Sequence, residues 1–270
     1  MSVLQAVILG VVQGLTEFVP VSSSGHLVLV PHLLGWHFDH VQAFIFDVLV
    51  QWGTLVAVCI YFRRDLIRIV RAFVAAVGRG AFFADPDARM GWYLIVATIP
   101  AVVVGLLARH AVEAAFASPR FTGLFLLVTT LLLVIAERVG QRNRTVDRMN
   151  WLDAFWVGCF QVLALLPGVS RSGATIAGGM IRNLDRPAAA RFSFLMSVPV
   201  MLGAGVLALK EMAAMPGLGE FLLPLSAGFF SALVSGYIAI RWLIGYLGRH
   251  SLFVFAGYCL LAGLCIFMLS

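Results

Sequence analysis

The sequence has few charged residues. Only 12% of its 270 residues are Asp, Glu, Lys or Arg, whereas 61% are hydrophobic, and the mean hydropathy is +0.97. These values lie far outside the range of an ordinary soluble domain. No hydrophilic stretch exceeds roughly 30 residues, which excludes a second, soluble domain. We therefore expect an integral membrane protein whose chemistry takes place in or at the bilayer.

Paired cysteines and familiar nucleotide or metal motifs are also missing. Cys59, Cys159, Cys259 and Cys265 lie singly in apolar runs, so we interpret them as small core residues rather than metal ligands or a redox pair. The chain has no GxxxxGK[ST] loop, no HExxH pair and no Rossmann glycine pattern, and nothing indicates a nucleic-acid partner. The N-terminus lacks the features of a secretory signal, so we expect Met1 onward to remain in the folded protein.

What the chain does have is long apolar runs. Runs of roughly 17 to 22 residues are about the length that a helix needs to cross a hydrocarbon core ~30 Å thick. They predict six transmembrane helices, at about 41–62, 92–109, 121–137, 192–210, 221–241 and 252–269. The predicted fold class is an all-α integral membrane protein with a single membrane domain, residues 1–270.

Two further apolar regions are broken in the middle. Region 3–35 is interrupted at Pro20, and its second arm would reach only about 12 Å at 1.5 Å per residue. Region 151–182 repeats this design, with its break at Pro167 and Gly168. We expect both regions to form re-entrant helical hairpins. Because non-helical backbone at membrane depth must be satisfied by protein or by a watery cavity, two such breaks predict an enclosed polar site.

The two halves of the chain, 1–148 and 149–270, match without gaps at an offset of 148 residues. The matching positions are Gly10, Gln13, Leu15, Val21, Ser22, Ser24, Gly25, Phe44 and Phe46, which fall on Gly158, Gln161, Leu163, Val169, Ser170, Ser172, Gly173, Phe192 and Phe194. We interpret this as an internal repeat. Since three predicted spans separate the hairpins, the halves should have inverted topologies.

Charge indicates the orientation. With these six spans, 15 of the 19 Lys and Arg residues fall on one face and 3 on the other, while Arg171 lies inside the second hairpin. The positive-inside rule makes the arginine-rich loops cytoplasmic, so both termini and the first hairpin should open outward. Inverted repeats with broken helices that meet near the midplane are a known transporter architecture.

The stretch EFVPVSSSGH at 17–26 carries the first candidate chemistry. An ionisable group such as Glu17 inside a membrane segment is costly and is a functional candidate by default, although a carboxyl hydrogen-bonded between helices is the alternative. Gln13 shares a helix face with Glu17 and could bind, orient or simply bridge two helices. His26 is a candidate acid or base; its alternative is a satisfied core histidine.

Serines at both breaks predict anion-binding helix ends. A helix N-terminus aimed into a cavity favours phosphate through its free N–H groups and positive dipole, although the serines could be caps only. Arg171 would add a planar guanidinium fork, unless it only pairs with Glu17. The candidate substrate-binding residues are Ser22, Ser24 and Gly25 at the first break, and Gly168, Ser170, Ser172, Gly173 and Thr175 at the second. Asp47 and Gln51 are weaker candidates, at the outward start of the first span.

Two motifs carry a family resemblance. QGLTEFVPVSSSGH at 13–26 and LPGVSRSGATI at 166–176 resemble the two signature regions of the bacterial undecaprenyl-diphosphate phosphatase family, once described as bacitracin-resistance proteins. The resemblance covers essentially the whole chain. It implies an enzyme of the bacterial inner membrane that removes the terminal phosphate of undecaprenyl diphosphate and regenerates the monophosphate carrier for peptidoglycan synthesis. It also implies a divalent cation, Mg²⁺ or Ca²⁺.

The resemblance assigns roles residue by residue. Ser23 and His26 match the proposed nucleophile and acid/base, Arg171 matches the diphosphate-binding arginine, and Glu17 belongs to the acidic pattern and is the one potential metal ligand. Gln13 stands where the family has Glu or Gln, so a second acidic group there is lacking. Two mechanisms stay open: attack by Ser23, deprotonated by His26 or Glu17, through a phosphoserine, or direct attack by water that Glu17 and a cation activate.

Two other classes of membrane protein share some of these features. The phosphatidic-acid type of membrane phosphatase also has SGH and SR elements, but it requires a histidine six places after the SR arginine and a lysine before SGH. This chain has Ala177 at that place, and its single lysine is Lys210. A transporter or flippase of a polyprenyl phosphate lipid would show the same inverted repeat and remains the alternative. The sequence does not indicate an oligomeric state.

Overall fold

The computed structural model describes residues 1–108, 112, 119–213 and 218–269. The all-helical class is confirmed: these residues contain no strand, only one isolated bridge between Arg144 and Leu184. The helices are α1 (Val3–Phe18), α2 (Ser23–Leu33), α3 (His40–Tyr61), α4 (Arg63–Arg79), α5 (Pro86–Leu107), α7 (Pro119–Val139), α8 (Trp151–Leu163), α9 (Arg171–Ile181), α10 (Arg186–Ala213), α11 (Leu218–Leu247) and α12 (Phe253–Leu269), with a 3₁₀ turn, η1, at Val146–Arg148.

Four of these helices are long and apolar enough to cross a membrane by length and composition: α3, α5, α7 and α11. The chain is therefore a multi-pass membrane protein. The other two predicted spans coincide with α10, of 28 residues, and α12, of 17 residues. Helix α5 begins at Pro86, earlier than the predicted start near 92, because the Asp85 carboxylate accepts hydrogen bonds from the N–H groups of Asp87 and Ala88.

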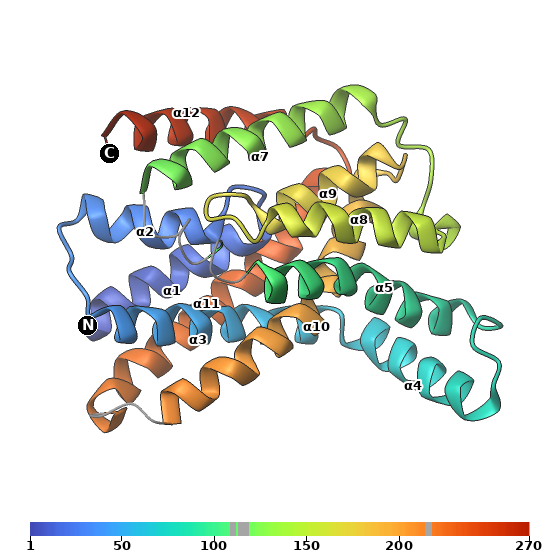
Figure 1. Ribbon diagram of the computed structural model, residues 1–270, viewed down its shortest axis with the longest axis horizontal. Helices are drawn as coiled ribbons and strands as arrows, with labels where there is room; N and C mark the ends of the chain where they lie inside the picture. The colour runs from blue at the N-terminus through green and yellow to red at the C-terminus, as the bar shows by residue number, and fades with distance from the viewer. Residues whose placement is uncertain (109–111, 113–118, 214–217, 270) are drawn as a thin grey trace.

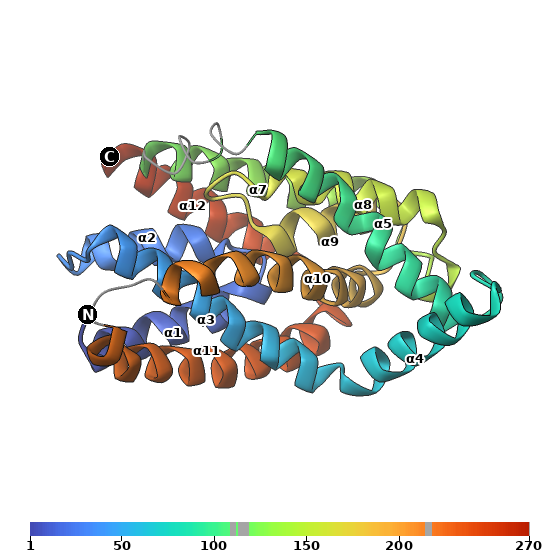
Figure 2. The same ribbon diagram turned by 60° about the horizontal axis from the view of Figure 1, so that its bottom comes forward.

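Helix α4 was not predicted from the sequence, which was interpreted there as an arginine-rich loop. Its buried side is formed by Ile69 and Ala76, and Gly80, with φ of +67°, ends it in the left-handed conformation. In Figures 1 and 2, α4 and the start of α5 diverge from the remaining helices at one end of the molecule. Apolar residues at three- and four-residue spacing explain the helix. The five arginines among them lower its hydropathy, so the segment was not predicted as a transmembrane helix.

The two broken regions form two helix pairs whose breaks face each other. Figure 1 shows α1–α2 and α8–α9 extending from opposite ends, with both breaks in the middle of the molecule. Contact between the breaks is direct, because the Ser172 hydroxyl lies 3.4 Å from the Val19 carbonyl oxygen that it donates to. The chain starts at the same end of the molecule at which α12 finishes (Figures 1 and 2).

Small residues set the position of α1. A Cβ on Gly10 would lie 2.3 Å from the Gly228 carbonyl oxygen of α11, and one on Gly14 would lie 2.6 Å from that of Ala232. Gly10 and Gly14 therefore form a GxxxG contact that lets two helix backbones approach closely. Since Gln13 and Glu17 lie on the same helix, this contact fixes where their side chains project.

A buried carboxylate, Asp153, connects the outer ends of α8 and α9 through two arginines. Arg144 donates to both oxygens of Asp153, at 3.2 and 2.6 Å, and Arg182 donates to Oδ1 at 2.8 Å. Burial of Asp153 opposes its ionisation, but the hydrogen bonds from Arg144 and Arg182 outweigh it and lower the pKa of the carboxyl. These bonds join the start of α8 to the end of α9, so they fix the hairpin that carries Arg171.

Candidate functional site

Glu17 is the centre of the polar group at the breaks. It lies in the last turn of α1 and is 7% exposed. One carboxylate oxygen, Oε2, accepts hydrogen bonds from Gln13 Nε2 at 2.9 Å and from the Ser23 hydroxyl at 2.6 Å. The other, Oε1, lies 2.7 Å from Arg171 Nη2. The structure thus brings together four residues that sequence analysis singled out, two of them 154 positions apart.

Arg171 has a donor to spare. Its Nη2 pairs with Glu17, which is the alternative role that the sequence analysis gave to Arg171. Its Nη1, however, is buried and has no hydrogen-bond partner among the described protein atoms. An unpartnered buried donor is costly, by about 1–3 kcal/mol. A guanidinium with one arm on a carboxylate and the other arm free can receive an anionic oxygen beside Glu17.

The serines at both breaks are helix caps, and they leave further donors free. The Ser22 hydroxyl accepts from the Gly25 N–H at 3.3 Å, and the Ser170 hydroxyl accepts from the Gly173 N–H at 3.0 Å. Each cap also contacts the next-but-one serine, Ser24 or Ser172, at 3.2 and 3.1 Å. The caps satisfy only the third N–H of each helix, so the first two N–H groups of α2 and of α9 have no intrahelical partner.

Gly168 shapes the second break. Its φ of +97° favours glycine, and a Cβ there would lie 2.3 Å from the Thr122 carbonyl oxygen of α7. The hydroxyl of Thr175, by contrast, is already used inside the fold, because it donates to the Arg171 carbonyl at 2.7 Å and lies 2.6 Å from the Ser193 hydroxyl. Thr175 therefore joins α9 to α10 in this structure.

His26 lies at the first break, and its imidazole contacts Ser22 and Tyr258. Its Nδ1 is 2.7 Å from the Ser22 carbonyl oxygen, and its Nε2 is 2.5 Å from the Tyr258 hydroxyl of α12. The structure shows no hydrogen bond from the imidazole to Ser23 or Glu17. Tyr258 was missed by sequence analysis, since a tyrosine in an apolar helix, 232 positions from its partner, carries no local signal.

Asp47 and Gln51 lie on α3. Among the described residues, no hydrogen bond or ion pair joins either side chain to Glu17 or Arg171, and the Gln51 backbone carbonyl accepts a hydrogen bond from the Thr54 hydroxyl at 2.6 Å. Their assignment to substrate binding stays a prediction.

The residues at the breaks do not fit a resident divalent cation. Across the described residues, no group of three or more His, Cys, Asp or Glu side chains could hold a metal ion. Among the described residues, Glu17 is the one carboxylate with hydrogen bonds to the residues at the breaks, and protein donors already occupy both of its oxygens. A protein site for Mg²⁺ or Ca²⁺ needs several oxygen ligands, so the substrate would have to supply most of them.

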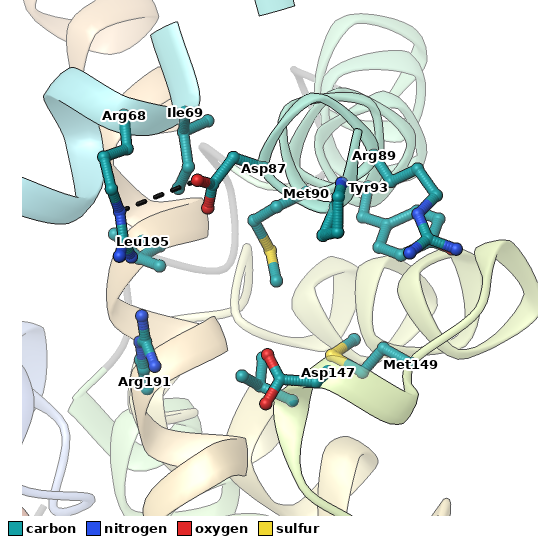
Figure 3. Close-up of a pocket in the computed structure, with 12 residues that line it drawn as sticks. Arg68, Ile69, Asp87, Arg89, Met90, Tyr93, Asp147, Met149, Arg191 and Leu195 are labelled. Carbon is teal, nitrogen blue, oxygen red and sulfur yellow. Dashed lines mark ion pairs between the residues drawn. The ribbon is translucent and has the colours of Figure 1, made fainter. Parts of the chain in front are cut away.

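A separate polar pocket of about 70 Å³ lies between α4, α5, η1 and α10 (Figure 3). Two of its three arginines form ion pairs nearby: Arg68 pairs with Asp65 at 2.7 Å and with Asp87 at 3.6 Å, and Arg191 pairs with Asp65 at 3.1 Å. None of the residues at the breaks lines it. We therefore place the candidate site at the breaks and not in this pocket.

Comparison with known proteins identifies the family. Residues 6–265 match the family described as Bacitracin resistance protein BacA. The chain belongs to this family. Among relatives named undecaprenyl-diphosphatase, that of Rubrobacter xylanophilus is 47% identical over 259 residues, covering 96% of this chain and 94% of the relative. That of Moorella thermoacetica is 44% identical (97% and 95% covered), and that of Methanobrevibacter smithii 40% (99% and 98% covered).

Proposed function

We propose that this member of the BacA family is an undecaprenyl-diphosphate phosphatase. It would hydrolyse the terminal phosphate of the C55 prenyl diphosphate and so regenerate the monophosphate carrier for cell-wall synthesis. The relatives that carry this name align over nearly the whole chain, which supports the proposal. The observation that carries it is the buried, unpartnered Nη1 of Arg171 beside Glu17 and Ser23. The arginine nitrogen can hold a phosphate oxygen, while the Glu17 carboxylate can activate the Ser23 hydroxyl as a nucleophile.

The favoured reaction uses Ser23. The carboxylate of Glu17 would take the proton of Ser23 as Oγ attacks the terminal phosphorus, and the hydrogen bond that the Ser23 hydroxyl donates to Glu17 supports this role. The bond from that phosphorus to the bridging oxygen breaks, the undecaprenyl monophosphate leaves, and water then cleaves the phosphoserine to release inorganic phosphate. Arg171 and the free N–H groups of α2 and α9 would neutralise charge on the transferred group.

Direct attack by water is the competing mechanism. Here Ser23 only orients Glu17 or the phosphate, and no covalent intermediate forms. A divalent cation, Mg²⁺ or Ca²⁺, would in either case be held mainly by the diphosphate, because in the part of the chain that the structure describes no group of acidic side chains could hold it.

The membrane arrangement that we propose is six spans, α3, α5, α7, α10, α11 and α12, with α1–α2 and α8–α9 as re-entrant hairpins of two inverted halves, 1–148 and 149–270. Opposed hairpins that meet at Glu17 and Arg171 support this arrangement. The arginine-rich loops would face the cytoplasm of a bacterium and the first hairpin the outer side of its inner membrane.

Phosphate release tests the proposal. Purified protein in detergent is given undecaprenyl diphosphate with Mg²⁺, with Ca²⁺ or with a chelator, and the released phosphate is measured. The variant Glu17→Gln is compared with the control Gln141→Glu, a surface change in a loop that does not reach the breaks. We expect the parent and Gln141→Glu to release phosphate and Glu17→Gln to lose at least about 10²-fold of kcat. A folded parent that releases none with any cation would contradict the proposal and favour the flippase alternative.

Ser23→Ala distinguishes the two mechanisms. With substrate labelled in the terminal phosphate, a rapid acid quench of the parent should trap label on the protein, and Ser23→Ala should trap none and fall to background turnover. Retention of a tenth or more of parental kcat by Ser23→Ala would instead support direct attack by water.

A further inference from the structure

The His26 imidazole is held on both sides, and the hydrogen bonds fix its tautomer. The Ser22 carbonyl oxygen can only accept, so Nδ1 must carry the proton in the bond that joins them at 2.7 Å. Nε2 of the neutral ring then has a lone pair, to which the Tyr258 hydroxyl donates. His26 is 7% exposed and Tyr258 is 45% exposed, so the pair connects the buried break to the outer face of α12.

The bond to Ser22 bears on the turn that presents Ser23. Ser22 has φ of 72°, a conformation that L side chains rarely adopt, whereas its counterpart Ser170 has φ of −68°. Strained residues persist only where their surroundings determine them. The Ser22 carbonyl accepts both the backbone N–H of His26, at 3.3 Å, and the Nδ1–H of its ring. These two bonds hold the Ser22 carbonyl, and Ser23 follows directly.

We propose that Tyr258 is a positioning residue: it fixes the His26 imidazole, which holds the Ser22 carbonyl and thereby the turn that places the Ser23 hydroxyl on Glu17. Tyr258 touches none of the reacting atoms, so it acts through His26. The inference rests on the proposed phosphatase function and adds a residue from α12 to that site.

Tyr258 also lines an open apolar groove of about 440 Å³ between α1, α11 and α12, with His26 at its wall. A residue that merely lined this groove would affect how a prenyl chain binds, and so KM. A residue that positions the turn affects the chemical step, and so kcat. The two roles therefore predict different kinetic changes.

The test uses Tyr258→Phe, which removes the hydroxyl and keeps the ring. The matched control is Tyr246→Phe. Tyr246 stacks on His250 with ring centroids 4.6 Å apart, as Tyr258 stacks on His26 at 5.6 Å, but in the described structure the Tyr246 hydroxyl makes no hydrogen bond to the imidazole. We expect kcat for undecaprenyl diphosphate to fall roughly three- to tenfold in Tyr258→Phe, the loss of one neutral hydrogen bond, with KM unchanged. Tyr246→Phe should match the parent.

A double-mutant cycle completes the test. If Tyr258 acts only through His26, then adding Tyr258→Phe to His26→Ala should cause no further loss of kcat. Equal activity of Tyr258→Phe and Tyr246→Phe, a rise in KM alone, or losses that multiply in the double variant would each overturn the proposal. An inactive parent would refute the phosphatase function itself, which separates the two failures.

Discussion

Arg171→Lys separates the charge of Arg171 from its shape. In the structure one guanidinium nitrogen pairs with Glu17 at 2.7 Å, and the other is buried without a partner. Lysine can keep the ion pair with its single ammonium group, but it lacks a second donor in a fixed plane. The substitution should therefore preserve folding and remove the arm that we assign to phosphate.

The expected magnitudes follow from these two contacts. Arg171→Ala would leave Glu17 buried without its cation, at a cost of about 3–5 kcal/mol, so loss of activity in that variant would be confounded with loss of stability. Arg171→Lys retains the pair and should cost much less. Loss of one preorganised donor to the transferred phosphate should lower kcat/KM about 10²- to 10³-fold.

The assay is phosphate release together with thermal unfolding in the same detergent. Arg182→Lys is the matched control, since Arg182 also donates to a buried carboxylate, Asp153 at 2.8 Å, but lies away from the breaks. We expect a similar, small change of Tm in both variants and a large loss of activity only in Arg171→Lys. Activity of Arg171→Lys within about threefold of the parent would refute the role given to the second nitrogen.

Two further predictions concern stability. Gly168→Ala should lower Tm markedly, because its Cβ would lie 2.3 Å from the Thr122 carbonyl oxygen. The control is Gly80→Ala, which is also at positive φ but has nothing within 4 Å of its Cβ, so it should show only the backbone penalty of about 1 kcal/mol. Equal shifts of Tm in the two variants would contradict the packing role of Gly168. Asp153→Asn should destabilise the fold by about 3 kcal/mol, since two arginines lose their partner. Because the pKa of Asp153 is lowered in the folded state, its stabilisation is present above the unfolded pKa of about 4 and is lost as pH falls through the folded value. The difference in Tm between parent and Asp153→Asn should therefore shrink in acid, and a constant difference from pH 7 to pH 3 would contradict this.

Much of the fold could be predicted because local sequence carries the signal. A span must be apolar over its whole length, so the four helices that are long and apolar enough to cross a membrane are visible in the chain itself. The two breaks are visible as well, because Pro20 and Pro167 follow the ends of α1 and α8. The all-helical class is accordingly confirmed. Helix α4 was missed because its arginines lower its hydropathy while its apolar residues keep helical spacing.

The sequence by itself determined the membrane environment, the helix breaks and the residue types that gather there, because composition and motif spacing are local properties. Only the tertiary structure decided which groups meet. It joined Glu17 to Arg171 and brought Tyr258 of α12 to His26. Such contacts depend on how helices distant in the chain pack, for example on the close approach that Gly10 and Gly14 allow, and no local pattern encodes that distance.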